Sequence, residues 1–518
     1  MRGSSARPKP SFPTRVKESL AFSDPPPLLK RQERQHNEEY RVIFCKVPLI
    51  SLASVILIVS VLSAPAMGQT KEAPKKKPNI VLMLADDLGY GDLGCYGQTK
   101  IRTPNLDRLA AEGMRFTQAY CGSTVCAPSR CVLMTGLHTG HCRTRGNGSG
   151  GSPKGNVPLQ PMDICVAELL KKAGYANALI GKWGLGEEGS VGVPNNKGFD
   201  FFFGYLNQAH AHNYYPDFLW RNSEKVKLPN VQSKQPQVAA TRVQFSPDLM
   251  IEESLRFLDD HRAKPFFLFF ASTLPHANNE KTRADGNGNE IPSDAPYTQE
   301  AWPQPEKSKA AMITRLDADV GKILDRLKTL GLDQNTLVLF ASDNGPHQEG
   351  GNKVEFFQSS GPLRGLKRSL TDGGIRTPAI ARWPGVIKPG SVSEHVWMFQ
   401  DFLPTACEVA QIEVPKAIDG HSILPALTGR GTQPIHDFLY WEFHENGFKQ
   451  AVRHKDWKAI RLAPGQPLQL FHIVKDPHED NDVAKENPAV VAEVEAYLKT
   501  ARTDSKEFPI TSPKKITK

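Results

Sequence analysis

Residues 78–87 read PNIVLMLADD, an apolar run that starts after a proline and stops at two carboxylates. A continuous apolar run of strand length is typical of a strand that is buried on both faces of a parallel sheet. A helix is expected next, because Thr103 and Pro104 form a helix start and Gly113 ends the apolar periodicity. This stretch therefore predicts a buried strand followed by a helix that covers the sheet.

The same alternation continues along the chain. Helices are expected at 164–172 and 308–330, and strands at 176–180, 265–271 and 336–341. Strands and helices in turn predict an α/β fold, with a large, mainly parallel sheet sandwiched by helices. Ligands of such sheets lie at the carboxyl ends of the strands, so polar residues there are candidates for a site.

The pattern changes near residue 434. Four short strands are expected, at 438–443, 451–452, 457–461 and 468–473. A helix at 488–500 is expected to follow them. This predicts a smaller C-terminal antiparallel sheet with one helix. The chain then divides into a preamble with a signal peptide (1–70), a catalytic domain (71–433), a small C-terminal subdomain (434–503) and a loose tail (504–518). Residues 146–155 and 278–300 are expected to be surface loops.

An apolar segment near the N-terminus has the layout of a signal peptide. Residues 47–67 follow Arg41 and Lys46 and end in small residues, with APAMG at 64–68. The uninterrupted apolar part is roughly sixteen residues long, shorter than the ~20 that a membrane-spanning helix needs. We therefore expect export to the periplasm or the medium, with no stable membrane insertion after cleavage.

The net charge of +9 does not indicate a nucleic-acid partner. Residues 1–70 hold 10 Lys or Arg and 5 Asp or Glu, which leaves 54 basic and 50 acidic residues over 71–518. A nucleic-acid footprint needs a basic stripe, and the remaining Lys and Arg are scattered. We expect no nucleic-acid partner and only a weak attraction for anionic substrates.

Two pairs of oxygen-bearing side chains follow predicted strands. Asp86 and Asp87 come directly after the strand at 79–85, and Asp343 and Asn344 follow the strand at 336–341. A pair of adjacent carboxylates at one strand end is more often a cap or a turn. Two oxygen-rich strand ends in one parallel sheet, however, can converge on one hard cation. The sequence therefore predicts a metal site at this edge.

A cysteine motif lies between the two pairs. Residues 126–130 read CAPSR, and Thr135-Gly136 follow. A bare Cys-x-Pro is usually an ordinary cysteine before a helix-starting proline, but the longer pattern is specific. It resembles the signature of the formylglycine-dependent sulfatases, of arylsulfatase type, within the alkaline phosphatase superfamily. The resemblance implies an alkaline-phosphatase-like fold and oxidation of Cys126 to formylglycine by a maturation enzyme.

Further residues match this family's site in the family's order. Arg130 matches the signature arginine, and Lys182 in GKW matches the sulfate-binding lysine. His276 in LPH matches the histidine that contacts the leaving oxygen, and Lys367, before DGGIRTP at 372–378, matches a second lysine. Each residue alone is a weak signal, and their joint order is the strong one. Residues 470–479 also resemble the family's closing segment, so the likeness covers nearly the whole mature chain.

One position departs from the family pattern. Members commonly read GKWHLG, whereas residues 181–186 read GKWGLG, so Gly184 stands where a histidine usually touches the formylglycine hydroxyl. The alternatives for its role are His210 and His212, in the aromatic and histidine-rich stretch 201–220, and His347 in the loop after Asp343. A plain role in a substrate loop is equally open for these histidines.

The resemblance implies hydrolysis of sulfate monoesters. One hydroxyl of hydrated formylglycine would attack sulfur, His276 or Lys367 would protonate the departing alcohol, and return to the aldehyde would expel sulfate. Arg130, Lys182 and Lys367 would screen the charge on the sulfate. The resemblance implies one Ca²⁺ per chain, favoured over Mg²⁺. Its ligands would be Asp86, Asp87, Asp343, Asn344 and the modified Cys126. The implied substrate is a sulfated small molecule or glycan.

Two other functions stay open at this stage. A phosphonate or phosphodiester hydrolase of the same superfamily can share the motif and the metal site. A catalytically idle carbohydrate-binding relative would retain the fold without the modification. Residues 201–220 and 278–300 are expected to line a sugar-binding cleft, whether the protein is a sulfatase or an idle relative.

The cysteine count fits an exported protein. Eight cysteines occur, and Cys45 precedes the predicted cleavage site, which leaves seven. If Cys126 is modified, six remain, enough for up to three disulfides in an oxidising compartment. Their pairing cannot be read from the spacing.

Overall fold

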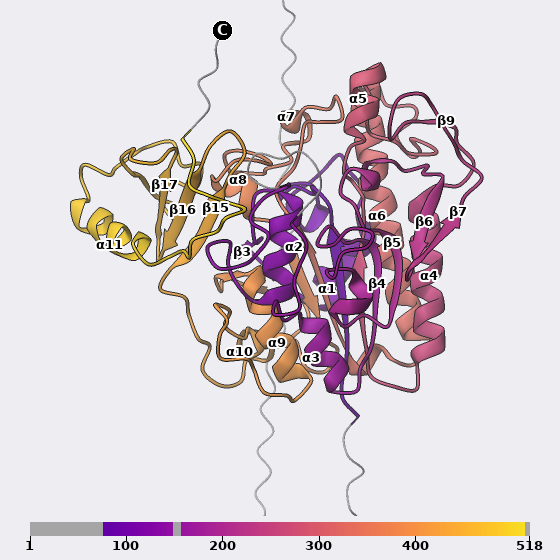
Figure 1. Cartoon of the computed structure of the whole chain (residues 1–518), viewed down its shortest axis with the longest axis horizontal. Coiled ribbons are helices and arrows are strands. Elements are labelled where there is room, and N and C mark those ends of the chain that lie inside the picture. Colours follow the sequence, from indigo (N-terminus) through magenta and orange to yellow (C-terminus); the bar gives the residue numbers. More distant parts are fainter. Residues whose placement is uncertain (1–75, 149–156, 513–518) are drawn as a thin grey trace, which may run out of the picture. The chain divides into compact units, whose positions relative to one another are not determined.

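A ten-stranded sheet forms the centre of the protein in the computed structural model, which describes residues 76–148 and 157–512 (Figure 1). Its strand order is β13-β2-β12-β11-β1-β10-β4-β5-β6-β7. The five central strands are parallel: β11 (Thr336–Ser342), β1 (Asn79–Ala85), β10 (Phe266–Ala271), β4 (Ala176–Lys182) and β5 (Phe201–Tyr205). The α/β prediction is confirmed, and the four predicted strands are all in this parallel centre.

The core explains why these strands are apolar without alternation. Ile80, Leu82 and Leu84 of β1 face one hydrophobic cluster, whereas Val81 and Met83 face another on the opposite side of the sheet. The first cluster is covered by α2 (Cys126–Thr135), α3 (Val166–Lys172) and α9 (Phe402–Val409). The second is covered by α1 (Pro104–Glu112), α4 (Ser246–His261) and α6 (Gln304–Thr329). Both faces of the strand are therefore buried, as the apolar run predicted.

The edges of the sheet hold short strands that the sequence did not predict. They are β12 (Ala379–Arg382), β2 (Met114–Phe116), β13 (Ser391–Ser393), β6 (Phe218–Arg221) and β7 (Glu224–Lys227). Two further pairs stand apart from the main sheet, β3 (Ala119–Tyr120) with β14 (Trp397–Met398) and β8 (Val231–Gln232) with β9 (Ala239–Thr241). Strands of two to five residues have too few positions to show a period, so pattern reasoning misses them.

Short helices complete the described fold. The α-helices are α5 (Asn279–Asp285), α7 (Val354–Phe357), α8 (Asp372–Ile375) and α10 (Leu424–Thr428). The 3₁₀ turns are η1 (Gly94–Tyr96), η2 (Pro194–Lys197), η3 (His210–His212), η4 (Asp333–Asn335) and η5 (Phe399–Asp401). The expectation of a loop over 278–300 is wrong at its start, because the Asn278 side chain accepts a hydrogen bond from the Lys281 N–H and caps α5. The helix expected at 308–330 begins earlier, after Pro303.

The C-terminal region forms the predicted antiparallel sheet with one helix. Its strands follow in sequence order, β15 (Leu439–Phe443), β16 (Lys449–His454), β17 (Trp457–Arg461) and β18 (Gln469–His472), and α11 (Pro488–Leu498) follows them. Two positions in the segment expected to be a loose tail, 504–518, contact the rest of the chain. Phe508 is fully buried, and the Phe448 N–H donates to the Thr511 carbonyl at 2.9 Å.

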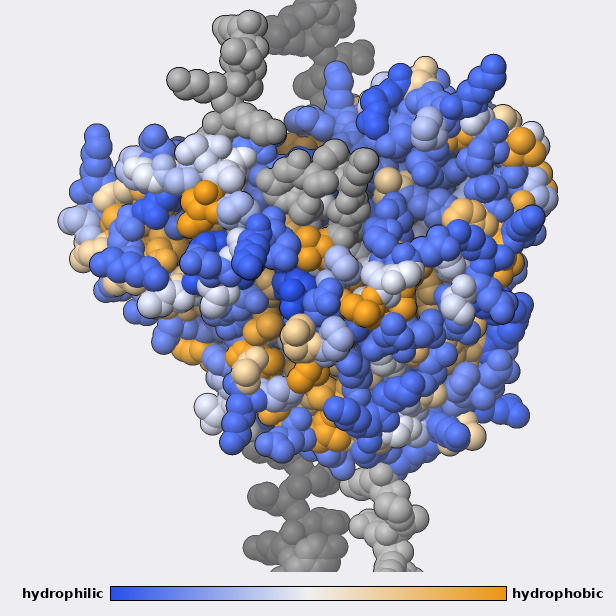
Figure 2. Space-filling model, viewed as in Figure 1, coloured by the Kyte–Doolittle hydropathy of each residue, from blue (hydrophilic) through white to orange (hydrophobic). Residues whose placement is uncertain are grey.

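The surface and the ends of the chain add three observations. On the face shown in Figure 2, hydrophobic residues lie in small groups among hydrophilic ones. Within 76–148 and 157–512, no helix is long and apolar enough to cross a membrane, and all seven cysteines are free. The predicted signal peptide, and the part of the Gly-rich loop at 149–156, lie outside the described residues.

A buried ion pair joins the C-terminal sheet to α8, with β3 beside it. Lys458 of β17 donates to Asp372 at 2.9 Å, and the Tyr120 hydroxyl donates to the other oxygen of that carboxylate at 2.8 Å. Burial alone would raise the pKa of Asp372, but Lys458 and Arg376 hold it at about 2. The carboxylate therefore stays charged inside the protein and depends on its cationic partners.

Replacing Lys458 by Met is expected to lower the free energy of unfolding by about 3–5 kcal/mol, because it removes a cation from a buried carboxylate. Urea unfolding at neutral pH measures this loss. Since the pKa of Asp372 is depressed from 3.8, the stabilisation is present above that value and is lost as the pH falls through about 2. The exposed pair Lys225–Glu188 gives the control: Lys225→Met should cost less than about 1 kcal/mol. Equal losses in both variants would contradict the role of Lys458.

Candidate active site

The carboxyl ends of the parallel strands bring the predicted site residues together. Asp86 and Asp87 follow β1, Asp343 and Asn344 follow β11, and His276 lies in the loop after β10. Lys182 is the last residue of β4. Because β11, β1, β10 and β4 are neighbours with the same direction, their ends meet at one edge of the sheet.

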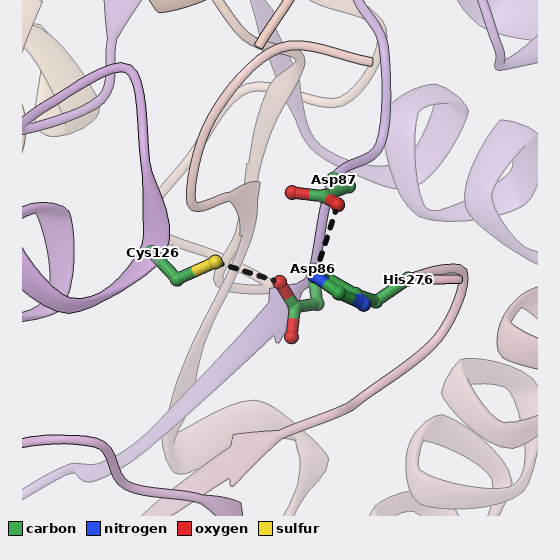
Figure 3. Close-up of side chains that lie close together, drawn as sticks. All are labelled: Asp86, Asp87, Cys126 and His276. Carbon is green, nitrogen blue, oxygen red and sulfur yellow. Dashed lines mark hydrogen bonds and ion pairs between the residues drawn. The ribbon is translucent and has the colours of Figure 1, made fainter. Parts of the chain in front are cut away.

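Cys126 is the first residue of α2 and points at this edge (Figure 3). Its side chain is buried, and the thiol donates to Asp86 Oδ1 at 3.5 Å. Burial, and then the negative charge of Asp86, raise the pKa of this thiol far above its ordinary value. The unmodified side chain therefore stays protonated, which makes it a poor nucleophile.

Two cations surround Asp86 on the side of α2. Lys182 Nζ donates to Asp86 Oδ2 at 2.6 Å. Arg130, one turn after Cys126 on the same helix face, donates two hydrogen bonds to Asp343 Oδ2 at 3.1 and 2.8 Å. The Arg130 guanidinium also donates to the Lys182 carbonyl at 2.7 Å, which fixes its plane. These bonds place two positive charges beside the cysteine.

Lys367 and His276 form the opposite side of the site. Lys367 Nζ donates to Asp87 Oδ2 at 2.8 Å and lies 3.0 Å from His276 Nε2 and 3.0 Å from Glu349 Oε2. His276 Nδ1 donates to the Ala277 carbonyl at 2.6 Å, so Nε2 is the nitrogen that faces Lys367. Burial, and then the charge of Lys367, lower the pKa of His276 well below its ordinary value.

The oxygen-rich strand ends fit a divalent cation. Asp86, Asp87, Cys126 and His276 offer ligand atoms within 4.8 Å of one another, and the four side chains converge on one space in Figure 3. Asn344 Oδ1 is buried and has no hydrogen-bond partner among the described residues, although its Nδ2 donates to Asp87 at 2.7 Å. Burial, and then the charge of Asp86, raise the pKa of Asp343 to about 7. Crowded carboxylates and an unpaired amide oxygen are the donors that Ca²⁺ prefers.

Comparison with known proteins identifies the family. The Sulfatase family model matches residues 78–412, and the model for the C-terminal part of N-sulphoglucosamine sulphohydrolase matches residues 366–506. The chain belongs to the sulfatase family. It is therefore a sulfuric ester hydrolase.

Individual relatives agree with this assignment. The N-acetylgalactosamine-6-sulfatase of Sus scrofa is 36% identical over 474 residues, which cover 82% of this chain and 84% of the relative. Arylsulfatase A of Homo sapiens is 31% identical over 81% of this chain and 85% of its own length. The crystal structure of Ps i-CgsB in complex with k-i-k-neocarrahexaose superposes with a TM-score of 0.71 at 30% identity, covering 84% of this chain and 95% of that one.

The three candidate histidines of this sulfatase lie in different places. His212 lines a cavity of about 270 Å³ together with Cys126, His276 and Lys367. Its ring stacks on that of His276 at 4.8 Å, and its Nδ1 lies 2.9 Å from Glu280. His210 instead packs against the Phe218 ring at 4.5 Å and lines a neighbouring cavity. Thus the structure brings His212, but not His210, to the predicted site.

His347 lies on the far side of His276 from the cavity. Its Nε2 is 2.8 Å from Lys309 Nζ and 3.0 Å from the Pro275 carbonyl, and its Nδ1 accepts from the Glu349 N–H. Neither Lys309 nor Glu349 could be found from the sequence, because a single charged residue in a helix or loop is usually solvated. Only the fold shows that Lys309 is buried and Glu349 half-buried beside the site.

Calcium is expected to stabilise the folded sulfatase if the strand ends bind it. A ligand that binds only the folded state adds about 2.7 kcal/mol at a concentration 100-fold above its dissociation constant. Differential scanning calorimetry of chelator-treated protein, with and without Ca²⁺, measures the shift, which Asp343→Asn should reduce. Asp325, whose side chain is mostly exposed, provides the control variant Asp325→Asn. An unchanged unfolding midpoint on adding Ca²⁺ and Mg²⁺ separately would exclude this site.

The two neighbouring histidines allow a matched comparison. His212→Ala should lower kcat/KM for a sulfate ester by about 10-fold or more, because it removes the ring that stacks on His276. His210→Ala should leave turnover nearly unchanged, since its ring points into the neighbouring cavity. Steady-state kinetics on both variants measure the difference, and equal activity of both would remove the special role of His212.

Proposed function

We propose that this sulfatase hydrolyses sulfate monoesters of a sulfated carbohydrate or an aryl alcohol, through formylglycine at position 126 and one Ca²⁺. One observation carries the proposal. The Cys126 thiol contacts Asp86, which also accepts from Lys182, and Cys126 lines one cavity together with His276 and Lys367. The high pKa of its buried thiol argues against direct attack by a thiolate.

Hydrated formylglycine would supply one hydroxyl that attacks sulfur and a second whose proton loss releases sulfate, and Ca²⁺ would screen negative charge. The metal would be held by Asp86, Asp87, Asp343 and Asn344. The chain's own cations would supply the remaining positive charge. Lys182, Arg130 and Lys367 are positioned to neutralise the terminal oxygens of the ester, and their hydrogen bonds to carboxylates keep them in place before substrate arrives.

Proton transfer to the leaving alcohol is assigned to the His276–Lys367 pair. The Nδ1 hydrogen bond of His276 to the Ala277 carbonyl fixes the ring, so Nε2 and the Lys367 ammonium face the cavity side by side, 3.0 Å apart. Lys367 Nζ also donates a hydrogen bond to Glu349 Oε2 at 3.0 Å. Because burial and the charge of Lys367 lower the pKa of His276, the proton is held on the Lys367 ammonium, and His276 Nε2 accepts a hydrogen bond from it beside the departing oxygen.

The lining of the cavity supports a carbohydrate substrate. It includes polar side chains suited to hydroxyl groups, namely Asn147, Asn207, Gln208, Asn279, Arg368 and Glu445. The Sus scrofa relative is named for a sulfated sugar, and the Ps i-CgsB structure contains a carrageenan oligosaccharide. We further propose that the enzyme is exported, through the predicted signal peptide, and receives formylglycine from a maturation enzyme.

Cys126→Ala should abolish sulfate release while leaving folding intact, because it removes the thiol that has to be oxidised to give the aldehyde, and with it the hydroxyl nucleophile. Sulfate release by ion chromatography, circular dichroism and mass spectrometry of the 126-containing peptide measure the three quantities. The wild-type protein is produced in a host with a formylglycine-generating enzyme, and the same protein from a host without it is the matched control. Full activity of the Ala variant would disprove the proposal.

A substrate panel separates this function from its alternatives. The matured enzyme is assayed on an aryl sulfate, on sulfated glycans and on phosphonate and phosphodiester substrates of the same aryl alcohol. Faster release from the sulfates is expected. A preference for phosphodiesters would favour the related hydrolase activity. An unmodified Cys126 and no turnover on any substrate, in protein made with the formylglycine-generating enzyme, would favour the idle relative.

A further inference from the structure

The space beside Gly184 is occupied by the side chain of Gln208. A Cβ atom added to Gly184 would lie 1.9 Å from Gln208 Nε2 and 2.8 Å from Gln208 Cδ. Gly184 also has a φ of +81°, which side chains rarely adopt. A histidine at position 184 is therefore incompatible with the Gln208 side chain where it stands.

The backbone holds the two residues side by side. The Trp183 and Gly184 N–H groups donate to the Tyr205 and Leu206 carbonyls at 2.9 and 3.0 Å, which extends the pairing of β4 with β5 beyond both strands. Asn207, the residue before Gln208, accepts from the His210 N–H at 3.0 Å and donates to Glu187 at 3.0 Å. These bonds fix the turn that carries Gln208.

The amide of Gln208 is buried with its hydrogen-bonding capacity unused. Neither Nε2 nor Oε1 has a partner among the described residues. Buried polar groups in folded proteins are nearly always paired, so an unpaired amide at a cavity wall points to a ligand group. The cavity that Gln208 lines also contains Cys126, His276, His212 and Lys367.

We propose that Gln208, whose side chain fills the space beside Gly184, is a sulfate-binding residue. Its Nε2 donates to an oxygen of the sulfate ester, beside Cys126. A carboxamide offers two donors and one acceptor and carries no charge, so it binds and orients the group but does not accept a proton. The inference deepens the proposed function and rests on it.

Gln208→Leu, which keeps the approximate size but removes the amide, should raise KM or lower kcat/KM for a sulfate ester by about 10- to 100-fold. Gln208→Glu should lower kcat/KM further, because it places a negative charge against the sulfate. Gln334→Leu, at an exposed glutamine in η4, is the matched control and should leave KM and kcat/KM unchanged. Unchanged kinetics in Gln208→Leu and Gln208→Glu would overturn the proposal.

Binding without turnover provides a readout that a purely structural role would not move. Calorimetric titration of p-nitrophenyl sulfate into Cys126→Ala should give an affinity about 10-fold weaker when Gln208→Leu is added, at an unchanged unfolding midpoint. Equal affinity in the two proteins would overturn the role in binding. If neither the matured wild type nor any variant releases sulfate from the panel, the proposed function fails, and this titration still reports on Gln208.

A double-mutant cycle tests the juxtaposition itself. Gly184→Ala should lower the free energy of unfolding of the wild type in urea, because position 184 has a positive φ and the new Cβ displaces the Gln208 amide. In a Gln208→Ala background the same change should cost less, since only the backbone strain at position 184 remains. Equal costs in the two backgrounds would show that Gln208 does not occupy this space.

Discussion

Repulsion among buried carboxylates is the constraint on which this active site depends. Asp86, Asp87 and Asp343 are fully buried at neighbouring strand ends, where like charges without compensation would be costly. The structure compensates them with Arg130, Lys182 and Lys367, each of which donates to one of these carboxylates. In the proposed function the same cations would bind the sulfate ester, so the contacts that stabilise the fold would also prepare the site for an anion.

Much of this arrangement could be predicted from the chain alone, because it depends on regular features. The apolar run at 79–85 fixes a strand buried on both faces, and parallel neighbours place Asp86 and Asp343 at one edge. The CAPSR motif starts a helix there, which puts Cys126 and Arg130 one turn apart on the same face. The periodicity of apolar residues and the alternation of strands with helices can both be read from the sequence, so these features could be predicted.

Other parts depend on contacts that no local pattern encodes. His210 and His212 are two residues apart and equivalent in sequence, yet they line different cavities because the η3 turn points them in different directions. Gln208 and Gly184 are far apart along the chain, and only the extended β4–β5 pairing shows that one fills the space beside the other. The burial of Phe508 and the hydrogen bond from the Phe448 N–H to the Thr511 carbonyl likewise follow from tertiary packing, not from composition.

The burial of α2 has a consequence for the order of events in the life of the protein. All ten residues of this helix, from Cys126 to Thr135, are buried, and Trp441 of the C-terminal sheet donates to the Cys121 carbonyl just before it. A modifying enzyme needs an extended, accessible segment around its target. Once the C-terminal strands have packed, that access is closed, so the oxidation of residue 126 in the proposed function would have to precede folding.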